Sequence, residues 1–573
     1  MRSTRRFYLI LAGLIGLMAG TAIIAGGGAW AAGVPAKPNI VVIMTDDQDI
    51  DSLPVMRHLL SYIGGGWINF TGAFANDAKC CPSRTSFLTG QYSQHHGVTA
   101  NGRGKNLDDS STLPVWLDNA GYYTGLFGKY LIGFPWDLDN NYVPPGWDVF
   151  NYNHEPVDDQ TASALEFLDD APAGAPFFLY LAYTAPHHTA KPPERYQDID
   201  VYIPPRRPNF NEEDVSDKPL WVRRLPLLTE EDIRAWDKER ANSQRELLAI
   251  DDGVLAIMNK LEDMGEMDNT VVIFLADQGF SWGSHRWIYK NCPYVECSQF
   301  PLFVRMPGGG PNRVESRLVS NVDLAPTIVE LAGATITGRE ADGRSFVSLL
   351  TDPDTVWPEG VLLERHGGDQ TARFFAVHTT GYMYAEYLNG DVELYDMVAD
   401  PYQMTNVVDD PDYAAARAEM DALLDSLMAG EPLPTPTPVA TSTATATATG
   451  TLHPTATPTT TATPTVTATG TLHPTATPTA TATLPPVTLD AFSFLPALFR
   501  DRPPASTPTP CVGQRWRGLH AIGGGGRSNR EPSNDPRARP SADSVAPADD
   551  PVPSCGDKSR ARQKARISPA TVK

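Results

Sequence analysis

The sequence predicts an α/β fold built around a mainly parallel β-sheet. Three apolar runs rich in β-branched and aromatic residues, Asn39–Met44, Phe177–Leu181 and Thr270–Leu275, have the length of buried strands. The segment Ser243–Met264 has the apolar spacing of an amphipathic helix and leads into the third run. Strands that alternate with helices along a chain favour parallel pairing, with helices covering the sheet.

Two of the predicted strands run directly into acidic residues. Asp46 and Asp47 follow the first strand, and Asp277 follows the third. In open α/β sheets the ligand site lies beyond the carboxyl ends of the strands. We therefore expect these carboxylates, which are far apart in the sequence, to meet at one edge of the sheet.

The chain has 573 residues and a formal net charge of −22, which is unevenly distributed. The stretch Asp490–Lys573 contains 14 lysines and arginines against 8 acidic residues, so it carries +6 and the rest of the chain carries −28. An acidic body argues against nucleic acid as a partner. An anionic substrate then has to be attracted by a local basic pocket or by a metal ion.

The N-terminal residues 1–36 have the pattern of an export signal. Arg2, Arg5 and Arg6 precede the apolar run Phe7–Ile24, and small residues with a candidate cleavage site at Ala29–Ala31 follow. The apolar run is also just long enough to remain as a membrane anchor. Both alternatives predict an exported protein, which is secreted if the segment is cleaved and attached to the cell surface if it is kept.

Composition divides the remaining chain into three regions. Residues 37–430 have an ordinary globular composition. Residues 431–488 are rich in Thr, Pro and Ala and contain a repeat, because Ala448–Thr459 recurs as Ala468–Thr479, so we expect an extended low-complexity spacer. Residues 489–573 are rich in Gly, Pro, Ser and Arg and are predicted to be a disordered tail.

The six cysteines do not have the spacing of zinc ligands. Cys292 and Cys297 are close enough in sequence for a local disulfide, which an exported protein can keep. Cys80 and Cys81 need a different explanation.

The segment Cys80–Gly90 has the features of a helix that begins at a reactive cysteine. Pro82 is a natural residue for the first turn of a helix, and a helix N-terminus favours anions. A cysteine placed there is reactive, and Arg84 one turn later is positioned to pair with an oxyanion. The alternative is an apolar cysteine pair before an ordinary surface helix.

This segment resembles the sulfatase signature, Cys-x-Pro-Ser-Arg followed by Thr-Gly, in which the first cysteine is oxidised to formylglycine. The resemblance implies that Cys80 is modified and that Cys81 is the variable position. It covers roughly residues 38–428, and further segments match in the expected order: Thr45–Asp49, Gly121–Leu131, Ala185–His187, Asp277–Gly279, Gly283–His285 with Lys290, and Glu393–Asp396 with Asp400, Pro401 and Asn406.

The resemblance also implies an alkaline-phosphatase-like sandwich. Its large, mainly parallel sheet is flanked by helices, and a smaller antiparallel sheet forms a C-terminal subdomain over about residues 358–430.

The resemblance implies a single calcium ion and its ligands. Calcium prefers six or more oxygen ligands, often carboxylates and carbonyls. The implied ligands are Asp46, Asp47, Asp277, Gln278 and an oxygen of the modified Cys80. Gln278 departs from the Asn or His that is usual at its position and carries its carbonyl one methylene further out.

The resemblance implies a positively charged lining around the nucleophile. Arg84 and Lys129 hold the hydrated aldehyde, and His187 and Lys290 contact the substrate sulfate, one of them protonating the leaving alcohol. His285 fits a further substrate-binding position. Leu131 stands where many sulfatases have a His, so one proton-transfer residue is missing or supplied from elsewhere.

Within the family the motifs are closest to those of N-acetylglucosamine-6-sulfatases. The expected activity is hydrolysis of the 6-O-sulfate of N-acetylglucosamine in glycosaminoglycan-like glycans or small sulfate esters, after maturation by a formylglycine-generating enzyme. The alternatives are a phosphonate monoester hydrolase or phosphodiesterase of the same superfamily, and a non-catalytic glycan-binding surface protein. Four tryptophans either stack on sugars or are ordinary core and rim aromatics: Trp136, Trp147, Trp282 and Trp287.

Overall fold

A computed structural model of the chain describes residues 37–62, 66–133, 142–310, 312–367 and 371–431. The predicted export segment, almost all of the spacer, the predicted tail and Trp136 lie outside these residues. Within the described ranges, every helix is too short or too polar to cross a bilayer.

The centre of the fold is an eight-stranded sheet in the order β11-β2-β10-β7-β1-β6-β4-β5. All neighbouring strands pair in parallel except β10, which is antiparallel to β2 and β7. The mainly parallel α/β fold predicted from the sequence is thus confirmed. The strands are β1 (Asn39–Thr45), β2 (Trp67–Phe70), β4 (Tyr123–Gly128), β5 (Val149–Tyr152), β6 (Phe177–Ala182), β7 (Thr270–Ala276), β10 (Leu302–Arg305) and β11 (Arg313–Glu315).

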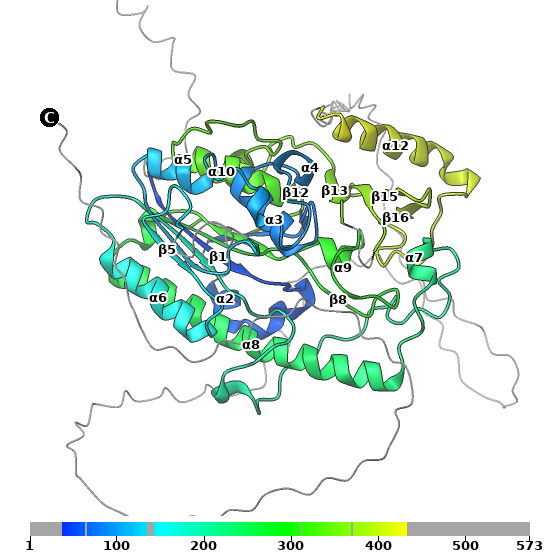
Figure 1. The fold of residues 1–573 in the computed structure, drawn as a ribbon, viewed down its shortest axis with the longest axis horizontal. Helices are drawn as coiled ribbons and strands as arrows, with labels where there is room; N and C mark the ends of the chain where they lie inside the picture. The colour runs from blue at the N-terminus through cyan, green and yellow to red at the C-terminus, as the bar shows by residue number, and fades with distance from the viewer. Residues whose placement is uncertain (1–36, 63–65, 134–141, 311, 368–370, 432–573) are drawn as a thin grey trace, which may run out of the picture. The chain divides into compact units, whose positions relative to one another are not determined.

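Helices cover both faces of this sheet (Figure 1). On one face lie α2 (Arg57–Tyr62), α6 (Val157–Asp170) and α8 (Glu230–Asp263), and on the other lie α3 (Cys80–Thr89), α5 (Leu113–Asn119) and α10 (Leu324–Leu331). The central strand β1 serves both layers, because successive side chains of a strand point to opposite faces. Ile40 and Val42 pack in the α3 layer, whereas Val41 and Ile43 pack in the α8 layer.

Shorter elements complete the main body. The helices are α4 (Ser93–His96), α7 (Leu220–Arg223), α9 (Val295–Ser298) and α11 (Val347–Thr351), and the two-stranded ribbons are β3 (Ala73–Phe74) with β12 (Val319–Ser320) and β8 (Ser281–Trp282) with β9 (Ile288–Tyr289). The 3-10 segments are Ile50–Val55, Gly104–Asn106, Glu194–Tyr196, Met267–Asn269, Asn321–Asp323 and Pro411–Tyr413.

Helix α8 is longer than the sequence pattern indicates. Its predicted part begins at Ser243, but the helix starts at Glu230, where Thr229 and Asp232 form a capping box. The first turns of α8 are largely exposed, so they lack the apolar spacing on which the prediction depended.

A second, four-stranded antiparallel sheet follows the main sheet in the sequence. It consists of β13 (Val361–Arg365), β14 (Phe374–His378), β15 (Tyr382–Tyr387) and β16 (Val392–Asp396), in that order. Helix α12 (Ala414–Met428) packs Leu424 and Leu427 against Leu362 and Val377 of this sheet. The small antiparallel sheet that the family resemblance implied is therefore present.

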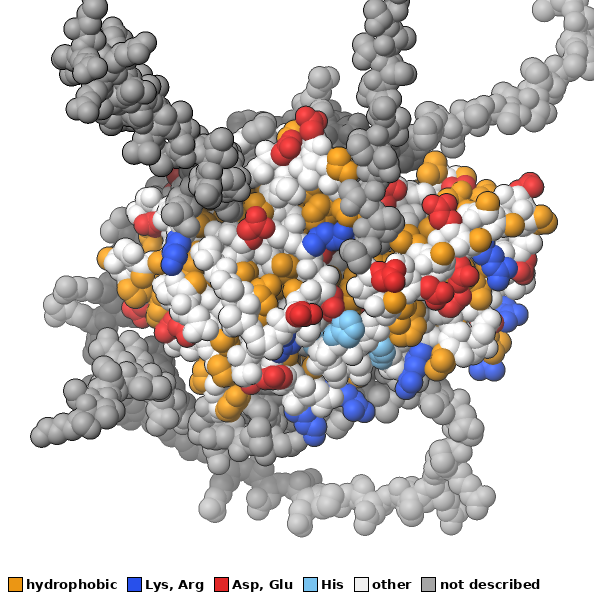
Figure 2. All heavy atoms as spheres, turned by 90° about the horizontal axis from the view of Figure 1, so that it is seen from above, with side chains coloured by type: hydrophobic (Ala, Val, Ile, Leu, Met, Phe, Trp, Pro, Cys, Tyr) orange, Lys and Arg blue, Asp and Glu red, His pale blue; other side chains and the backbone are white. Residues whose placement is uncertain are grey.

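The surface shown in Figure 2 mixes charges of both signs. Acidic, basic and hydrophobic side chains of the described residues are interspersed there rather than gathered into one large patch. An anionic substrate that approaches this face meets no single attractive field, so its selection has to come from a specific site.

The strands β1, β4, β6 and β7 all end at the same edge of the sheet, because they are parallel and paired in register. At the end of β4 the chain needs a glycine. Gly128 has φ +101°, and a Cβ there would lie 2.1 Å from the carbonyl oxygen of Ala182. This close approach sets the direction in which the next residue, Lys129, leaves the sheet.

Candidate active site

Three of the predicted site residues come from the ends of strands at this edge. Asp46 follows β1, Lys129 follows β4 and Asp277 follows β7. The backbone turns sharply after Asp46, since Asp47 adopts a left-handed conformation with φ 62°, and the N–H of Asp47 donates to the Asp277 carboxylate at 3.0 Å. The two acidic loops are thereby held against each other.

Helix α3 brings Cys80 to the same edge as its first residue. The Sγ of Cys80 is fully buried and lies 2.9 Å from Lys290 Nζ, 3.5 Å from an Asp46 carboxylate oxygen and 3.5 Å from Gln278 Nε2. The hydroxyl of Ser83, in the first turn of α3, donates to the backbone carbonyl of Asp277. The helix start and the end of β7 are thus joined directly, which places position 80 among charged groups.

Three carboxylates concentrate negative charge beside Cys80. Oxygen atoms of Asp46, Asp47 and Asp277 all lie within 4.8 Å of one another, and all three side chains are buried. Burial, together with repulsion by Asp46, raises the pKa of Asp277 to about 8. Carboxylates this close in a dry site cannot all stay ionised without cations among them.

The donor set suits a hard divalent cation such as calcium, which prefers oxygen ligands. Besides the three carboxylates, Gln278 offers an amide whose Oε1 is buried and has no hydrogen-bond partner among the described residues. Its Nε2 faces Asp47 and Cys80, so rotation of the amide by half a turn would direct the oxygen to the same place. The implied ligand residues therefore fit the ion that the family resemblance implies.

Four basic side chains surround the carboxylates. Arg84 donates to Asp277 at 2.8 Å, Lys129 donates to Asp46, and Lys290 donates to both oxygens of Asp47 at 2.6 Å. His187 Nε2 lies 3.5 Å from Asp47. Burial alone would raise the pKa of Asp46, but the neighbouring Lys129, His187, Arg84 and Lys290 together hold that pKa well below its usual range.

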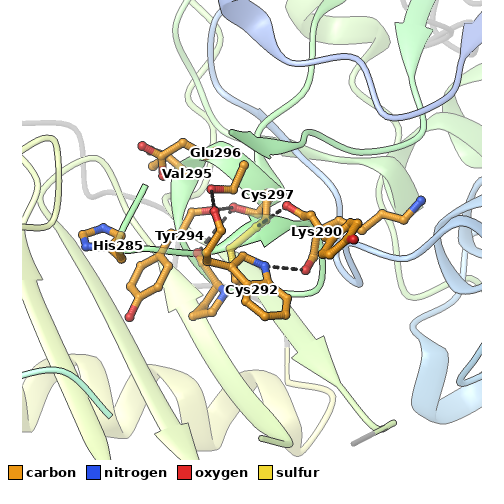
Figure 3. The surroundings of a disulfide bond; sticks show 12 residues. His285, Lys290, Cys292, Tyr294, Val295, Glu296 and Cys297 are labelled. Carbon is orange, nitrogen blue, oxygen red and sulfur yellow. Dashed lines mark hydrogen bonds between the residues drawn. A yellow bond between two sulfur atoms is a disulfide. The ribbon is translucent and has the colours of Figure 1, made fainter. Parts of the chain in front are cut away.

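The structure brings together all but one of the residues predicted for the site. His285 lies elsewhere, because its ring is fully buried with Nδ1 2.6 Å from Glu212 and Nε2 3.2 Å from the Asn209 amide. In Figure 3 it lies on the opposite side of the disulfide from Lys290. Its predicted substrate-binding role finds no support in these contacts, which hold the segment around Asn209 and Glu212 in place.

A disulfide and a buried glutamate fix the loop that carries Lys290. Cys292 and Cys297 are joined, and Trp287 Nε1 donates to the carbonyl of Lys290 at 2.8 Å (Figure 3). Tyr294, inside the disulfide loop, donates to Glu393 on β16 at 2.8 Å. Glu393 also accepts hydrogen bonds from Tyr387 and Tyr395, so the small sheet supports the Lys290 loop from behind.

Helix α8 fixes the segment that carries His187. Ser243 donates to the carbonyl of Pro186 at 3.2 Å, and Glu246 accepts from the N–H of Lys191 at 2.6 Å. The His187 side chain remains 33% exposed, which makes it the member of the cluster that a substrate reaches from solvent. This support comes from the part of α8 that the sequence pattern predicts.

Sequence reasoning did not single out His154, a titratable residue whose pKa responds to the charges of Lys129 and Asp46. His154 follows β5, its ring lies 3.2 Å from the Tyr152 hydroxyl, and burial together with nearby Lys129 lowers its pKa. Leu131, where many sulfatases have a His, is fully buried in the core. His154 follows a short, half-buried edge strand with no recognisable motif, so only the pairing of β5 with β4 reveals its position.

Comparison with known proteins identifies the family. The sequence profile described as "Sulfatase" matches residues 38–334, which is more than half of the chain. The chain belongs to the sulfatase family. A second profile, described as "N-sulphoglucosamine sulphohydrolase, C-terminal", matches residues 283–430.

Among curated proteins, this sulfatase is similar to N-acetylglucosamine-6-sulfatases and to an extracellular sulfatase. It is 29% identical to human N-acetylglucosamine-6-sulfatase over 447 residues, covering 65% of this chain and 81% of that protein. It is 26% identical to N-acetylglucosamine-6-O-sulfatase of Bacteroides thetaiotaomicron over 486 residues, covering 68% of this chain and 86% of that protein. It is also 29% identical to an extracellular sulfatase, the SULF-1 homolog of Drosophila melanogaster, covering 59% of this chain and 34% of that protein.

Solved structures share the fold of this sulfatase. One, described as a complex with its substrate D-glucosamine-2-N,6-O-disulfate, has a TM-score of 0.59 at 22% identity and covers 69% of this chain and 98% of its own. Another, the phosphonate monoester hydrolase of Agrobacterium radiobacter, has a TM-score of 0.60 at 22% identity and covers 69% of this chain and 96% of its own. The family, the alkaline-phosphatase-like fold and the class of sulfuric ester hydrolase predicted from the sequence are confirmed.

The support of the His187 segment by Glu246 predicts a pH-dependent stability. Burial raises the pKa of Glu246 from 4.5 to about 7. The stability that the protonated carboxyl gives the folded protein is therefore fully present below pH 4.5 and is lost as pH rises through 7. Glu246→Gln removes the ionisation but keeps an acceptor for the Lys191 N–H. The free energy of unfolding of the variant, relative to that of the wild type, should be higher at pH 8 than at pH 5 by up to about 3 kcal/mol.

Thermal unfolding of both proteins at the two pH values measures this difference. Any cost of the new amide group is the same at both pH values and cancels. Glu231→Gln, an exposed change on the same helix, is the control and should show no such difference. An equal effect of Glu246→Gln on stability at pH 5 and at pH 8 would contradict the raised pKa of Glu246.

Proposed function

We propose that this sulfatase hydrolyses the 6-O-sulfate ester of N-acetylglucosamine in glycosaminoglycan-like glycans, using a formylglycine made from Cys80 and a calcium ion. The observation that carries the proposal is the position of Cys80, buried at the start of α3 with Lys290, Asp46 and Gln278 around its Sγ. The names of the curated relatives, which are N-acetylglucosamine-6-sulfatases, support the choice of substrate.

Two groups supply the chemistry that the chain's own side chains lack. A hydrated formylglycine at position 80 would supply two hydroxyls, one as the nucleophile toward sulfur and one whose deprotonation would let the sulfate leave as the aldehyde re-forms. Asp46, Asp47, Asp277 and Gln278 would hold the calcium ion, which would supply positive charge for the nucleophilic hydroxyl and for the sulfate oxygens.

The side chains around position 80 have distinct tasks in this proposal. Arg84 and Lys129 attract the oxygens at position 80 with their positive charges. Asp277 holds the Arg84 side chain in place, and Asp46 holds that of Lys129. Lys290, whose ammonium lies 2.9 Å from Cys80 Sγ, faces the point where the ester sulfur has to sit.

A proton for the departing alcohol comes from His187 or Lys290. His187 is the more accessible of the two, and its ring reaches Asp47 at 3.5 Å.

We further propose that the protein is exported and matured by a formylglycine-generating enzyme. The similarity to extracellular sulfatases and the signal-like residues 1–36 support export. Retention of that segment, rather than cleavage, would attach the enzyme to the cell envelope.

Replacement of the nucleophile tests the reaction. Cys80→Ala should abolish hydrolysis of N-acetylglucosamine 6-sulfate while the protein stays folded, because no other side chain among the described residues takes the place of Cys80 at the start of α3. Cys81→Ala is the matched control, since Cys81 is equally buried and adjacent but has its Sγ against the backbone of Ile132. Release of sulfate and circular dichroism of each variant are the measurements.

This experiment, together with assays of the wild type for hydrolysis of other esters and for glycan binding, separates the alternatives. Substantial residual activity of Cys80→Ala would refute the role of Cys80. Hydrolysis of phosphonate esters or phosphate diesters by the wild type in preference to sulfate esters would favour a phosphonate monoester hydrolase or phosphodiesterase. Glycan binding without hydrolysis of any ester would favour a non-catalytic surface protein.

Calcium binding is tested without an activity assay. Protein treated with a chelator should melt at a lower temperature, and added Ca²⁺ should restore the melting temperature. At a Ca²⁺ concentration about one hundred times the Kd, the free energy of unfolding should rise by about 2.7 kcal/mol. Asp277→Asn should lose most of this response because it removes one of three buried carboxylates. A wild-type melting temperature that ignores both chelator and Ca²⁺ would contradict the ligand set.

A further inference from the structure

Three different kinds of metal ligand meet at position 80 in the chain as it is encoded, before any conversion of Cys80. The Sγ of Cys80, a carboxylate oxygen of Asp46 and a ring nitrogen of His187 all lie within 4.8 Å of one another. Cys80 and Asp46 are fully buried, whereas the His187 side chain is 33% exposed and gives an ion a way in from solvent. A sulfur, an imidazole and a carboxylate together form the donor set of Zn²⁺ rather than that of Ca²⁺.

The hydrogen bonds of His187 leave one ring nitrogen available to a metal ion. Its Nδ1 contacts the backbone carbonyl of His188, which can only accept, so Nδ1 carries the proton. In the neutral ring Nε2 then holds a lone pair, and it lies 3.5 Å from a carboxylate oxygen of Asp47. Two acceptors that face each other need a cation or a proton between them. Metal-binding histidines are held in the same way, with the second N–H on a backbone carbonyl or a carboxylate.

The sulfur of Cys80 has hydrogen-bond donors around it as well as the Asp46 carboxylate. Lys290 Nζ donates to Sγ at 2.9 Å, and Gln278 Nε2 lies 3.5 Å from the same atom. The thiolate is the form of cysteine that binds metal ions, so binding of a metal releases the Sγ proton. A metal-bound sulfur at position 80 would therefore keep two donors in its outer shell, which orient it.

The charge and the donor atoms of the site both change with the state of residue 80. The three buried carboxylates are paired with three cations, Arg84, Lys129 and Lys290. A divalent ion adds two positive charges, and a Cys80 thiolate neutralises one of them. Formylglycine would put oxygen where the unconverted chain has sulfur. The donor set would then consist mainly of oxygens, which suit calcium.

We infer that residue 80 decides which metal ion the site takes. The unconverted chain binds Zn²⁺ through Cys80, Asp46 and His187, and conversion to formylglycine replaces this zinc site by the calcium site. Asp47 is the fourth zinc ligand, because its carboxylate borders both Asp46 and His187. On binding, Sγ gives up its proton and bonds to zinc without a change of oxidation state.

The zinc site rests only on the encoded residues, whereas the calcium site rests on the proposed function. The zinc ligands come from three segments that are far apart in the sequence, so cysteine spacing could not indicate them. Zinc would occupy both Cys80 and His187, and a chain that escapes conversion would therefore be a zinc protein without sulfatase activity.

Metal binding by the unconverted protein tests this inference. The full-length chain is produced in a host without a maturation enzyme, and the mass of its tryptic peptide confirms a thiol at position 80. Co²⁺, used as a spectroscopic substitute for Zn²⁺, should give the near-ultraviolet charge-transfer band of a cobalt–thiolate bond, and added Zn²⁺ should remove the band. Zn²⁺ should also raise the melting temperature at concentrations at which Ca²⁺ leaves it unchanged.

Three variants of the unconverted protein assign the ligands. Cys80→Ser should lose the cobalt–thiolate band. Cys81→Ala is the matched control and should keep it, because the Sγ of Cys81 contacts the backbone of Ile132. His187→Ala should keep the band but weaken Zn²⁺ binding by about a hundredfold. Circular dichroism shows that each variant is folded.

The outcomes separate this inference from the proposed function. A cobalt complex of the unconverted protein without the thiolate band, or the same band in Cys80→Ser, would overturn the inference. Converted protein that binds Zn²⁺ as tightly as the unconverted chain would also overturn it. Failure of the converted protein to hydrolyse sulfate esters would instead overturn the proposed function and leave the zinc site as it stands.

Discussion

The mutual repulsion of Asp46, Asp47 and Asp277 is the constraint on which the structure of the site depends. Their oxygens share a buried volume within 4.8 Å of one another, at the point where two central strands end. Such a group of carboxylates is stable only when positive charge surrounds it. Arg84, Lys129 and Lys290 supply that charge from three different segments of the chain, and the site also fits a calcium ion.

Each of these cations is held by a part of the fold that the core builds for other reasons. Arg84 comes from α3, which packs on one face of the sheet, and Lys129 follows the strand that pairs with β6. Lys290 depends on the disulfide loop and, through Tyr294 and Glu393, on the small antiparallel sheet. The second sheet therefore contributes to the active site without placing any of its own side chains beside Cys80.

The sequence was informative wherever a residue follows a strong local pattern. Buried strands end in Asp46 and Asp277, and the helix that begins at Cys80 has Pro82 in its first turn, so their convergence could be predicted. The charges that act on His154 and the support that Glu393 gives to the Lys290 loop could not be predicted, because they depend on the pairing of an edge strand and on packing between distant parts of the chain. His285 shows the opposite case, since its motif position suggested the substrate site but its ring is engaged by Glu212 and Asn209. The antiparallel direction of β10 likewise has no local sequence signal.

The chemical state of residue 80 tests the central claim most directly. Trypsin cleaves after lysine and arginine, so Lys79 and Arg84 delimit a short peptide that begins with this residue. The mass of that peptide should be measured in enzyme purified from a host that carries the maturation enzyme and shown to release sulfate. We predict an aldehyde, or its hydrate, at position 80 and an unmodified thiol at Cys81. A plain thiol at position 80 in protein that hydrolyses sulfate esters would contradict the account.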